Sequence, residues 1–242
     1  MASGAIGQVY LFPTFLDEGN LLVIPPYVLD GIKECQAFFV ENERSTRRYF
    51  KQVWKEMVIE NYEWHTIHKA EEEVKDIFKK LLQRGITIGI VSEAGCPCIA
   101  DPGQLLVEAA HAMGARVKPF VGPSSILLAL MASGMNGQQF KFTGYLPIDE
   151  NERIKTLREL ESESFGKKST QVFIETPYRN NQLLDAILKT CKPNTRLCIA
   201  VNITGVSEAI MTKTIDQWVK NKPDIHKQPA IFLLQAGSIF AT

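Results

Sequence analysis

The sequence predicts an α/β protein made of two α/β domains, and three features of the chain support this fold class. Short apolar runs of strand length alternate with longer segments that have the periodicity of amphipathic helices. Two of these runs end in loops rich in Gly, Pro and Ser, at residues 92–103 and 122–125. The character of the chain changes near residue 147, so residues 1–147 and 148–242 are expected to form separate domains.

The first domain is expected to alternate strands with helices. Apolar and aromatic runs predict strands at residues 8–12, 37–40, 86–91, 117–121 and 140–145, the last closing this domain. Helices are expected at about residues 26–35, 45–53, 70–84, 105–114 and 126–132. Ser45 is expected to cap the second helix, and Ser124 or Ser125 the fifth. The apolar residues of the third helix share one face, which belongs in the core: Val74, Ile77, Phe78, Leu81 and Leu82.

The second domain shows the same alternation with more charged helices. Helices are expected around Leu157, from Leu183 to Leu188 and around Trp218. Strands are expected at residues 170–175, 195–202, 208–213 and 230–236, with the second and third of these paired.

The strands at 86–91 and 117–121 each lead into one of the two small-residue loops. Gly and Pro allow a loop backbone to approach a ligand closely. We expect the two strands to be adjacent in a parallel sheet, with both loops at its carboxyl edge. Ligands of α/β proteins bind in the crevice at that edge, so the sequence predicts a ligand site there.

Composition and charge exclude several classes of protein. Of the 242 residues, 45% are hydrophobic and 22% charged, and 27 Lys and Arg balance 27 Asp and Glu. Zero net charge gives no global attraction for nucleic acid or membranes, although a local basic patch remains possible. No apolar run is long enough to span a bilayer and no signal segment is recognised, so a cytoplasmic protein without a membrane partner is expected.

The cysteines and the missing motifs narrow the chemistry further. The five Cys are irregularly spaced, and one residue separates Cys96 from Cys98 instead of the two typical of metal or redox pairs. No metal site is therefore expected. Phosphate-loop, dinucleotide-binding and Ser-hydrolase motifs are absent as well. The loops are suited to a compact polar ligand that is held without covalent chemistry.

A basic cluster lies in the predicted helix at 45–53 and just before it, formed by Arg44, Arg47, Arg48 and Lys51. It has two interpretations, a solvated helix face or a surface that contacts phosphate. The first is favoured, because isolated runs of charge usually serve solvation.

Four segments, in their order and spacing, resemble one family. Residues 91–103 read V-S-E-A-G-C-P-C-I-A-D-P-G, residues 122–125 G-P-S-S, residues 142–147 F-T-G-Y-L-P and residues 175–179 E-T-P-Y-R. They resemble the tetrapyrrole methylase superfamily, most closely its branch of bacterial 16S ribosomal RNA cytidine 2′-O-ribose methyltransferases. In that branch the first loop reads S-D-A-G-T-P-x-I-S-D-P-G. Residues 41–44, E-N-E-R, are a weaker match to the branch's E-D-T-R.

The resemblance implies a methyltransferase that binds S-adenosylmethionine in a cleft between the two α/β domains, and it implies a homodimer. The donor-binding residues implied are Ala94, Gly95, Pro97, Ile99, Ser124 and Ser125, with Ile174, Glu175 and Tyr178 beside the adenosine and Pro229 and Ala230 near the adenine. It assigns no catalytic residue. For each of these positions the alternative is a purely structural role in a loop.

Two segments depart from the branch, both on the acceptor side of the cleft. The branch's T-P-I-G-N-L-x-D loop is represented by P-T-F-L-D-E at residues 13–18, and its R-E-L-T-K segment by V-N-I-T-G at residues 201–205. Three functions remain open: methylation of RNA, methylation of a small molecule such as a tetrapyrrole, and donor binding without catalysis. RNA methylation with a diverged acceptor site is the main expectation.

Overall fold

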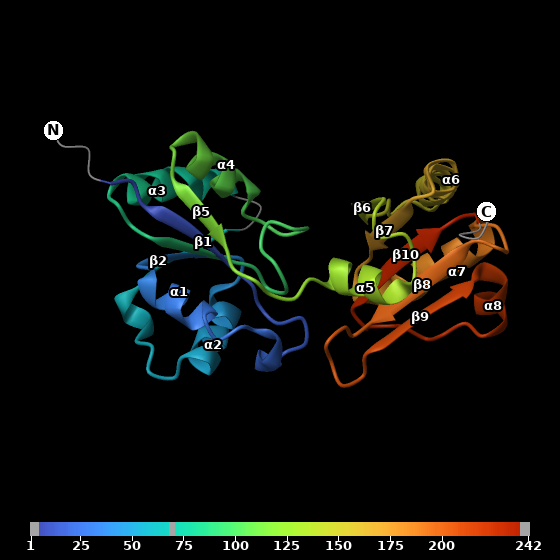
Figure 1. Ribbon diagram of the computed structural model, residues 1–242, viewed down its shortest axis with the longest axis horizontal. Coiled ribbons are helices and arrows are strands. Elements are labelled where there is room, and N and C mark those ends of the chain that lie inside the picture. Colours follow the sequence, from blue (N-terminus) through green and yellow to red (C-terminus); the bar gives the residue numbers. More distant parts are fainter. Residues whose placement is uncertain (1–4, 68–70, 238–242) are drawn as a thin grey trace. The chain divides into compact units, whose positions relative to one another are not determined.

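The computed structural model describes residues 5–67 and 71–237, and the chain divides into two compact units, residues 1–124 and 125–242 (Figure 1). The division falls before the predicted boundary at residue 147. The reason is that α5 (Ser125–Ser133) packs on strands of the second sheet, and β6 (Phe140–Tyr145) is itself a strand of that sheet.

The first unit is built on a parallel sheet of β1 (Gln8–Phe12), β2 (Ala37–Val40), β3 (Glu63–Thr66), β4 (Ile88–Val91) and β5 (Arg116–Pro119). The strand order is β3-β2-β4-β1-β5, so β1 separates β4 from β5, which were expected to be adjacent. Phe12 and Val40 both pair with Val91, which brings the ends of β1, β2 and β4 level. Because all pairings are parallel, the loops after β1, β4 and β5 leave the same edge of the sheet.

Helices cover both faces of this sheet: α1 (Val28–Glu34), α2 (Glu43–Val53), α3 (Glu71–Gln83) and α4 (Gln104–Ala112), together with the 3₁₀ turns η1 (Leu21–Val23) and η2 (Ile59–Asn61). Alternate residues of each strand face opposite cores. Phe39 and Ile88 join the core under α3 and α4, whereas Phe12 and Phe38 join the core under α1 and α2. Figure 1 shows these two helix pairs on opposite sides of the sheet.

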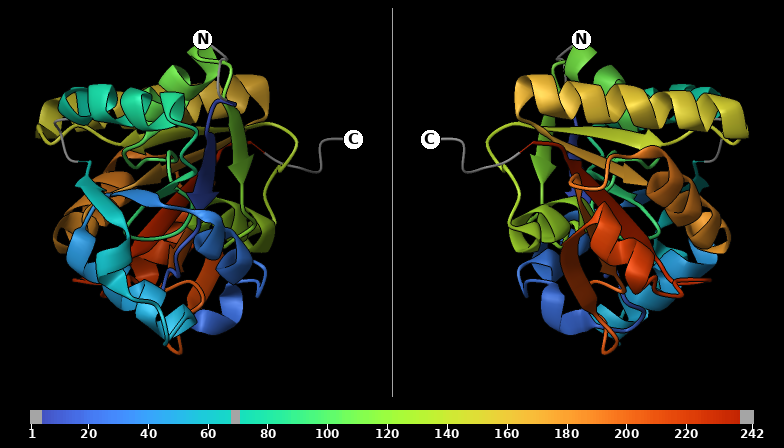
Figure 2. Two further views of the ribbon diagram at one scale, coloured as in Figure 1. Left: turned by 90° about the vertical axis from the view of Figure 1, so that its left-hand side faces the viewer. Right: turned by 90° about the vertical axis from the view of Figure 1, so that its right-hand side faces the viewer.

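The second unit has a mixed sheet of β6, β7 (Thr170–Ile174), β8 (Arg196–Val201), β9 (Ala209–Thr214) and β10 (Ala230–Gln235), in the order β6-β7-β10-β8-β9. Only β6 and β7 are parallel, and β8 pairs with β9 as expected. The remaining elements are α6 (Glu150–Lys167), η3 (Pro177–Arg179), α7 (Asn180–Thr190) and α8 (Ile215–Lys220). Figure 2 shows the long helix α6, which packs against α7. In the described part of the chain no helix is both long and apolar enough to cross a membrane.

Three local expectations differ from the structure. Asn42, and not Ser45, caps α2, because the helix begins at Glu43 and the Asn42 side chain accepts hydrogen bonds from two backbone N–H groups of the first turn. Ile77 is 41% exposed and lies outside the core stripe of α3. The predicted start of α3 at residue 70 lies outside the described residues. The strand at 140–145 was expected to close the first half, but it pairs with β7 of the second sheet.

Candidate functional site

The loop after β4 carries four of the predicted donor-binding residues, Ala94, Gly95, Pro97 and Ile99. Its path requires left-handed backbone at Gly95, where φ is +74°. Cys98 and Ala100 are also left-handed, with φ values of 68° and 62°. Non-glycine residues adopt this conformation only where the surrounding structure imposes it, so the loop has a defined, strained shape.

Three loops are joined at this edge of the first sheet. The N–H of Thr14, in the loop after β1, donates to the carbonyl of Gly95 over 2.8 Å. The Cys96 thiol donates to the carbonyl of Pro123 over 3.4 Å, which ties the loops after β4 and β5 together. A Cβ on Gly122 would lie 2.1 Å from the Cβ of Pro13, so only glycine fits there. The first unit thus places residues 122 and 123 beside residues 95 and 96, while Ser125 begins α5 of the second unit.

A cavity of about 200 Å³ opens among the loop after β1, helix α2 and the loop after β4. Its walls combine hydroxyl and carboxylate groups with apolar side chains, and the lining residues are Thr14, Phe15, Leu16, Glu18, Ser45, Thr46, Arg48, Tyr49, Ser92, Glu93 and Ala94. The hydroxyl of Tyr49 is buried and donates to the carbonyl of Pro13 over 2.9 Å, fixing α2 against the first loop. Sequence reasoning missed this cavity, because its walls come from segments far apart in the chain.

Acidic side chains surround the loop after β4. The Glu93 N–H donates to Glu41 Oε2 over 3.0 Å, and the Glu93 carboxylate accepts a hydrogen bond from the Ser45 hydroxyl. Asp101 lies nearby and is partly buried. Burial, together with the negative charges of Glu41 and Glu93, raises the pKa of Asp101 to about 7. The edge of the first sheet therefore has one carboxylate, that of Asp101, which can hold or exchange a proton near neutral pH.

The basic cluster of α2 splits into two pairs of residues. Arg47 is paired with Glu43 and its guanidinium lies 5.0 Å from the centre of the Trp64 ring, and Lys51 donates to the backbone carbonyls of Lys55 and Met57. These two side chains support the local fold. Arg44 is exposed, and Arg48 reaches Glu18 over 2.7 Å at the rim of the cavity, with both side chains more than half exposed.

The second unit brings the other predicted donor residues to one edge of its own sheet. Ile174 ends β7 and pairs with Ile231 of β10, so Glu175 lies near Pro229 and Ala230. The carbonyl of Pro229 accepts the N–H of Asn202 over 3.0 Å. The Tyr178 side chain, in η3, is 70% exposed, which leaves its ring available to a ligand.

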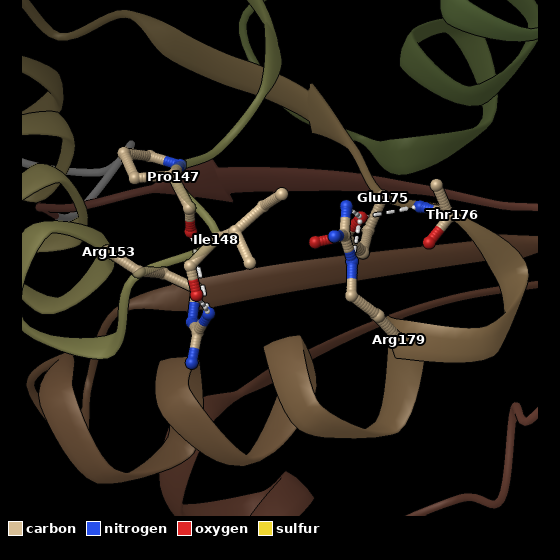
Figure 3. Close-up of polar contacts among 6 residues, drawn as sticks. All are labelled: Pro147, Ile148, Arg153, Glu175, Thr176 and Arg179. Atoms are coloured by element: carbon tan, nitrogen blue, oxygen red, sulfur yellow. Dashed lines mark hydrogen bonds and ion pairs between the residues drawn. The ribbon is translucent and has the colours of Figure 1, made fainter.

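Two arginines fix this edge, as Figure 3 shows. Arg179 donates through Nε and Nη2 to Glu175 Oε1, over 3.0 and 2.6 Å, and the Thr176 N–H donates to the same oxygen. Arg153, only 3% exposed, donates to the carbonyl of Ile148 over 2.8 Å. The pair between the buried Glu175 and the partly exposed Arg179 therefore sets the path of the chain after β7. Arg153 stabilises the turn after β6.

The segment after β8, where the branch has Arg, Glu and Lys, forms a tight turn. Asn202 and Thr204 have φ values of 50° and 70°, and the Thr204 N–H donates to Glu208 Oε2 over 2.7 Å. Gly205 donates through its N–H to the carbonyl of Asn202 over 2.9 Å. Residues 201–205 offer no cationic side chain at this turn.

The cysteines are reduced, and burial raises the pKa of the Cys96 thiol and so favours its neutral form. No group of three or more His, Cys, Asp or Glu suited to a metal ion occurs within residues 5–67 and 71–237.

The sequence is similar to a known family and to named proteins. Residues 19–218 match the family model of tetrapyrrole (corrin/porphyrin) methylases. The protein named "Ribosomal RNA small subunit methyltransferase I" of Halalkalibacterium halodurans is 30% identical, over 88% of this chain and 70% of its own length. Its namesake in Vibrio cholerae is 29% identical, over 95% of this chain and 77% of its own length.

Solved structures share the fold at low identity. The methyltransferase CobJ superposes with a TM-score of 0.63 at 17% identity, covering 96% of this chain and 95% of its own. Uroporphyrin-III C-methyltransferase from Thermus thermophilus, complexed with S-adenyl homocysteine, superposes with a TM-score of 0.57 at 15% identity, covering 95% and 97%. These likenesses confirm the predicted α/β fold class. Because the family model spans most of its length, the chain belongs to the tetrapyrrole (corrin/porphyrin) methylases, a family of methyltransferases.

Proposed function

We propose that the protein transfers a methyl group from S-adenosylmethionine and that the loop after β4 holds the donor. The observation that carries this proposal is the defined shape of that loop, which is left-handed at Gly95 and joined to the loops after β1 and β5. Such a loop presents backbone groups close to a ligand. The Thermus thermophilus neighbour, whose title names a bound S-adenyl homocysteine, supports a donor of this kind.

The proposed donor site comprises the residues that the resemblance implies. In the first unit these are Ala94, Gly95, Pro97, Ile99 and Ser124, and in the second Ser125, Ile174, Glu175, Tyr178, Pro229 and Ala230. A sulfonium methyl is already activated, so the chain has to hold nucleophile, methyl carbon and sulfur in line at close distance. The reaction proposed here requires no metal.

The test of donor binding is calorimetry with S-adenosylmethionine. A Cβ on Gly95 would lie 3.2 Å from Leu16 and 3.4 Å from the Pro123 carbonyl, and the left-handed backbone disfavours any side chain. We expect Gly95→Val to abolish binding and a chelator to leave wild-type binding unchanged. Gly134→Val is the matched control, because φ is +65° there and no atom lies within 4 Å of its Cβ. Unchanged affinity in Gly95→Val would remove the loop from the site.

For the acceptor we propose a ribose hydroxyl of RNA, at a site that has diverged from the 16S ribosomal branch. The named relatives act on ribosomal RNA of the small subunit, which supports RNA, and this acceptor would place the protein in the cytoplasm. The turn at residues 201–205 has lost the branch's Lys, and a lost charged contact costs about 1.5–3 kcal/mol, roughly one to two decades in affinity.

Undermethylated small ribosomal subunits test this divergence. We expect slow or absent 2′-O-methylation of the branch's cytidine by the purified protein with S-adenosylmethionine. Rapid, stoichiometric methylation there would contradict it. A small-molecule acceptor and donor binding without turnover are the alternatives, and labelled donor offered to whole-cell RNA and to a metabolite extract separates them.

A further inference from the structure

We propose that the cavity beside the loop after β4 receives the ribose of the acceptor, and that Glu93 accepts the proton of the methylated hydroxyl. This inference rests on the proposed function and adds a proton acceptor and a substrate pocket to it. Glu93 lines the cavity and immediately precedes Ala94, the first residue proposed to hold the donor. The proton acceptor and the donor loop are thus consecutive in the chain.

Glu93 is both accessible and oriented. Its side chain is exposed, while its backbone N–H is fixed by Glu41 Oε2 over 3.0 Å and its carboxylate accepts a hydrogen bond from the Ser45 hydroxyl. Ser45 belongs to α2, so the carboxylate is held between two walls of the cavity. A general base has to lie within hydrogen-bonding reach of the proton it removes, and a carboxylate fixed in a cavity wall meets that requirement.

Other charged side chains lie around Glu93. Glu41 and Asp101 lie beside Glu93, and Glu18, Arg48 and Tyr49 face the same cavity from the first loop and from α2. Four carboxylates, those of Glu18, Glu41, Glu93 and Asp101, and one arginine therefore lie in this region. The cavity therefore places a proton acceptor next to several other carboxylates and one cation.

The volume of the cavity indicates the size of acceptor group that it can hold. Its volume of about 200 Å³ is below the roughly 300–1,000 Å³ of sites for drug-sized ligands and suits a single sugar ring. Arg48 at the rim is paired with the exposed Glu18, and exposed ion pairs stabilise little. Arg48 can therefore exchange Glu18 for a phosphate oxygen of the RNA backbone, a stronger partner for a guanidinium.

Transfer of the methyl group to the hydroxyl conserves atoms and charge. The hydroxyl oxygen forms a bond to the methyl carbon while its proton passes to the Glu93 carboxylate. The bond between carbon and the sulfonium sulfur breaks, and its electron pair remains on sulfur. The products are the methyl ether, a neutral thioether and a protonated Glu93, which returns its proton to water.

The experiment compares Glu93→Gln, Glu93→Asp and the control Glu108→Gln, an exposed carboxylate on α4. Methyl transfer from labelled donor into undermethylated whole-cell RNA is followed across pH, and S-adenosylmethionine binding is measured by calorimetry. We expect Glu93→Gln to keep its donor affinity and to lose about 10²–10⁴-fold in kcat. Its rate should also lose the dependence on pH that wild type shows. Glu93→Asp should recover much of the rate, and Glu108→Gln should behave like wild type.

The possible results distinguish failure of the proposed function from failure of the role assigned to Glu93 and its cavity. Loss of donor binding in the wild type would defeat the proposed function itself. If the donor binds normally but Glu93→Gln retains its rate and pH profile, only the role of Glu93 is overturned. If wild type binds the donor but transfers no methyl group to RNA, the ribose pocket is overturned while donor binding stands.

Discussion

Gly122 packs against Pro13 so closely that it controls how the loop after β5 meets the loop after β1. A Cβ at this position would lie 2.1 Å from the Pro13 Cβ, and the proline ring cannot rotate away. The contact helps to hold together the loops that carry the proposed donor site. At the scale of the residue, this edge of the sheet depends on the absence of a side chain.

Gly122→Ala is therefore expected to destabilise the first unit by about 1–3 kcal/mol, the usual cost of forcing atoms into a packed site. Urea unfolding followed by the fluorescence of Trp54 and Trp64, both in the first unit, measures this change. Gly137→Ala serves as the control, since no atom lies within 4 Å of its Cβ. Equal midpoints for wild type and Gly122→Ala would show that the loops can move apart at no cost.

Asp101 gives the stability a predictable dependence on pH. Its pKa of about 7 in the folded chain exceeds the ordinary value of 3.8, so between these values the folded state binds more protons than the unfolded state. The contribution of Asp101 to stability is therefore full below about pH 4 and is lost as the pH rises to 7. Because solvent reaches this carboxyl, the loss is expected to be only about 1–2 kcal/mol.

Asp101→Asn should remove the contribution of this carboxyl to the pH dependence of stability. We compare the free energy of unfolding in urea at pH 5 and pH 8. Between these two values the wild type should lose more stability than the variant, so the variant should gain stability relative to wild type at pH 8. Asp76→Asn, at an exposed position of α3, should leave the pH dependence of wild type unchanged. A wild-type pH dependence that persists in Asp101→Asn would assign the effect to another group.

At the scale of the element, α2 organises the cavity. The helix contributes Ser45, Arg48 and Tyr49 to the walls, and its N-terminus is fixed by Asn42, whose side chain accepts from the N–H groups of Arg44 and Ser45 over 3.0 and 3.3 Å. The position of the first turn therefore controls how Ser45 meets Glu93.

Asn42→Ala removes this cap and should cost about 0.5–2 kcal/mol of stability. Asn42→Asp keeps an acceptor oxygen and should stay within a few tenths of wild type, which separates the lost hydrogen bonds from the change of side chain. Urea unfolding of both variants, again read from the tryptophans of the first unit, checks the prediction. Equal losses in the two variants would mean that the cap contributes nothing.

At the scale of the whole molecule, the family resemblance predicts a homodimer. The second unit exposes apolar side chains on α5 and β9, namely Leu127, Met131 and Met211, which is surface of the kind that a stable interface covers. Sedimentation equilibrium at micromolar concentration should give twice the mass of one chain. Met131→Glu should shift the mass towards one chain and Val219→Glu, on α8, should not. A wild-type mass of one chain would refute the dimer.

The sequence by itself determined the local elements and the family. Helix and strand periods depend on which residues are buried within a segment, so the segments at 8–12, 37–40 and 105–114 were predicted nearly to the residue. Gly and Pro at 92–103 and 122–125 marked the loops, and their order and spacing carried the resemblance that the family model confirms.

Only the tertiary structure decided which segments meet. The pattern of 140–145 predicts a strand but not its partner, and parallel pairing with β7 assigns it to the second sheet. In the sequence, the basic residues of α2 form one cluster. In the structure, Arg47 contacts Trp64 and Glu43, whereas Arg48 lies at the cavity rim. The cavity joins Thr14 to residues more than 30 and 70 positions further along the chain. Periodicity reports that a side chain is buried, whereas its partner is set by contacts between distant segments, which a local pattern does not contain.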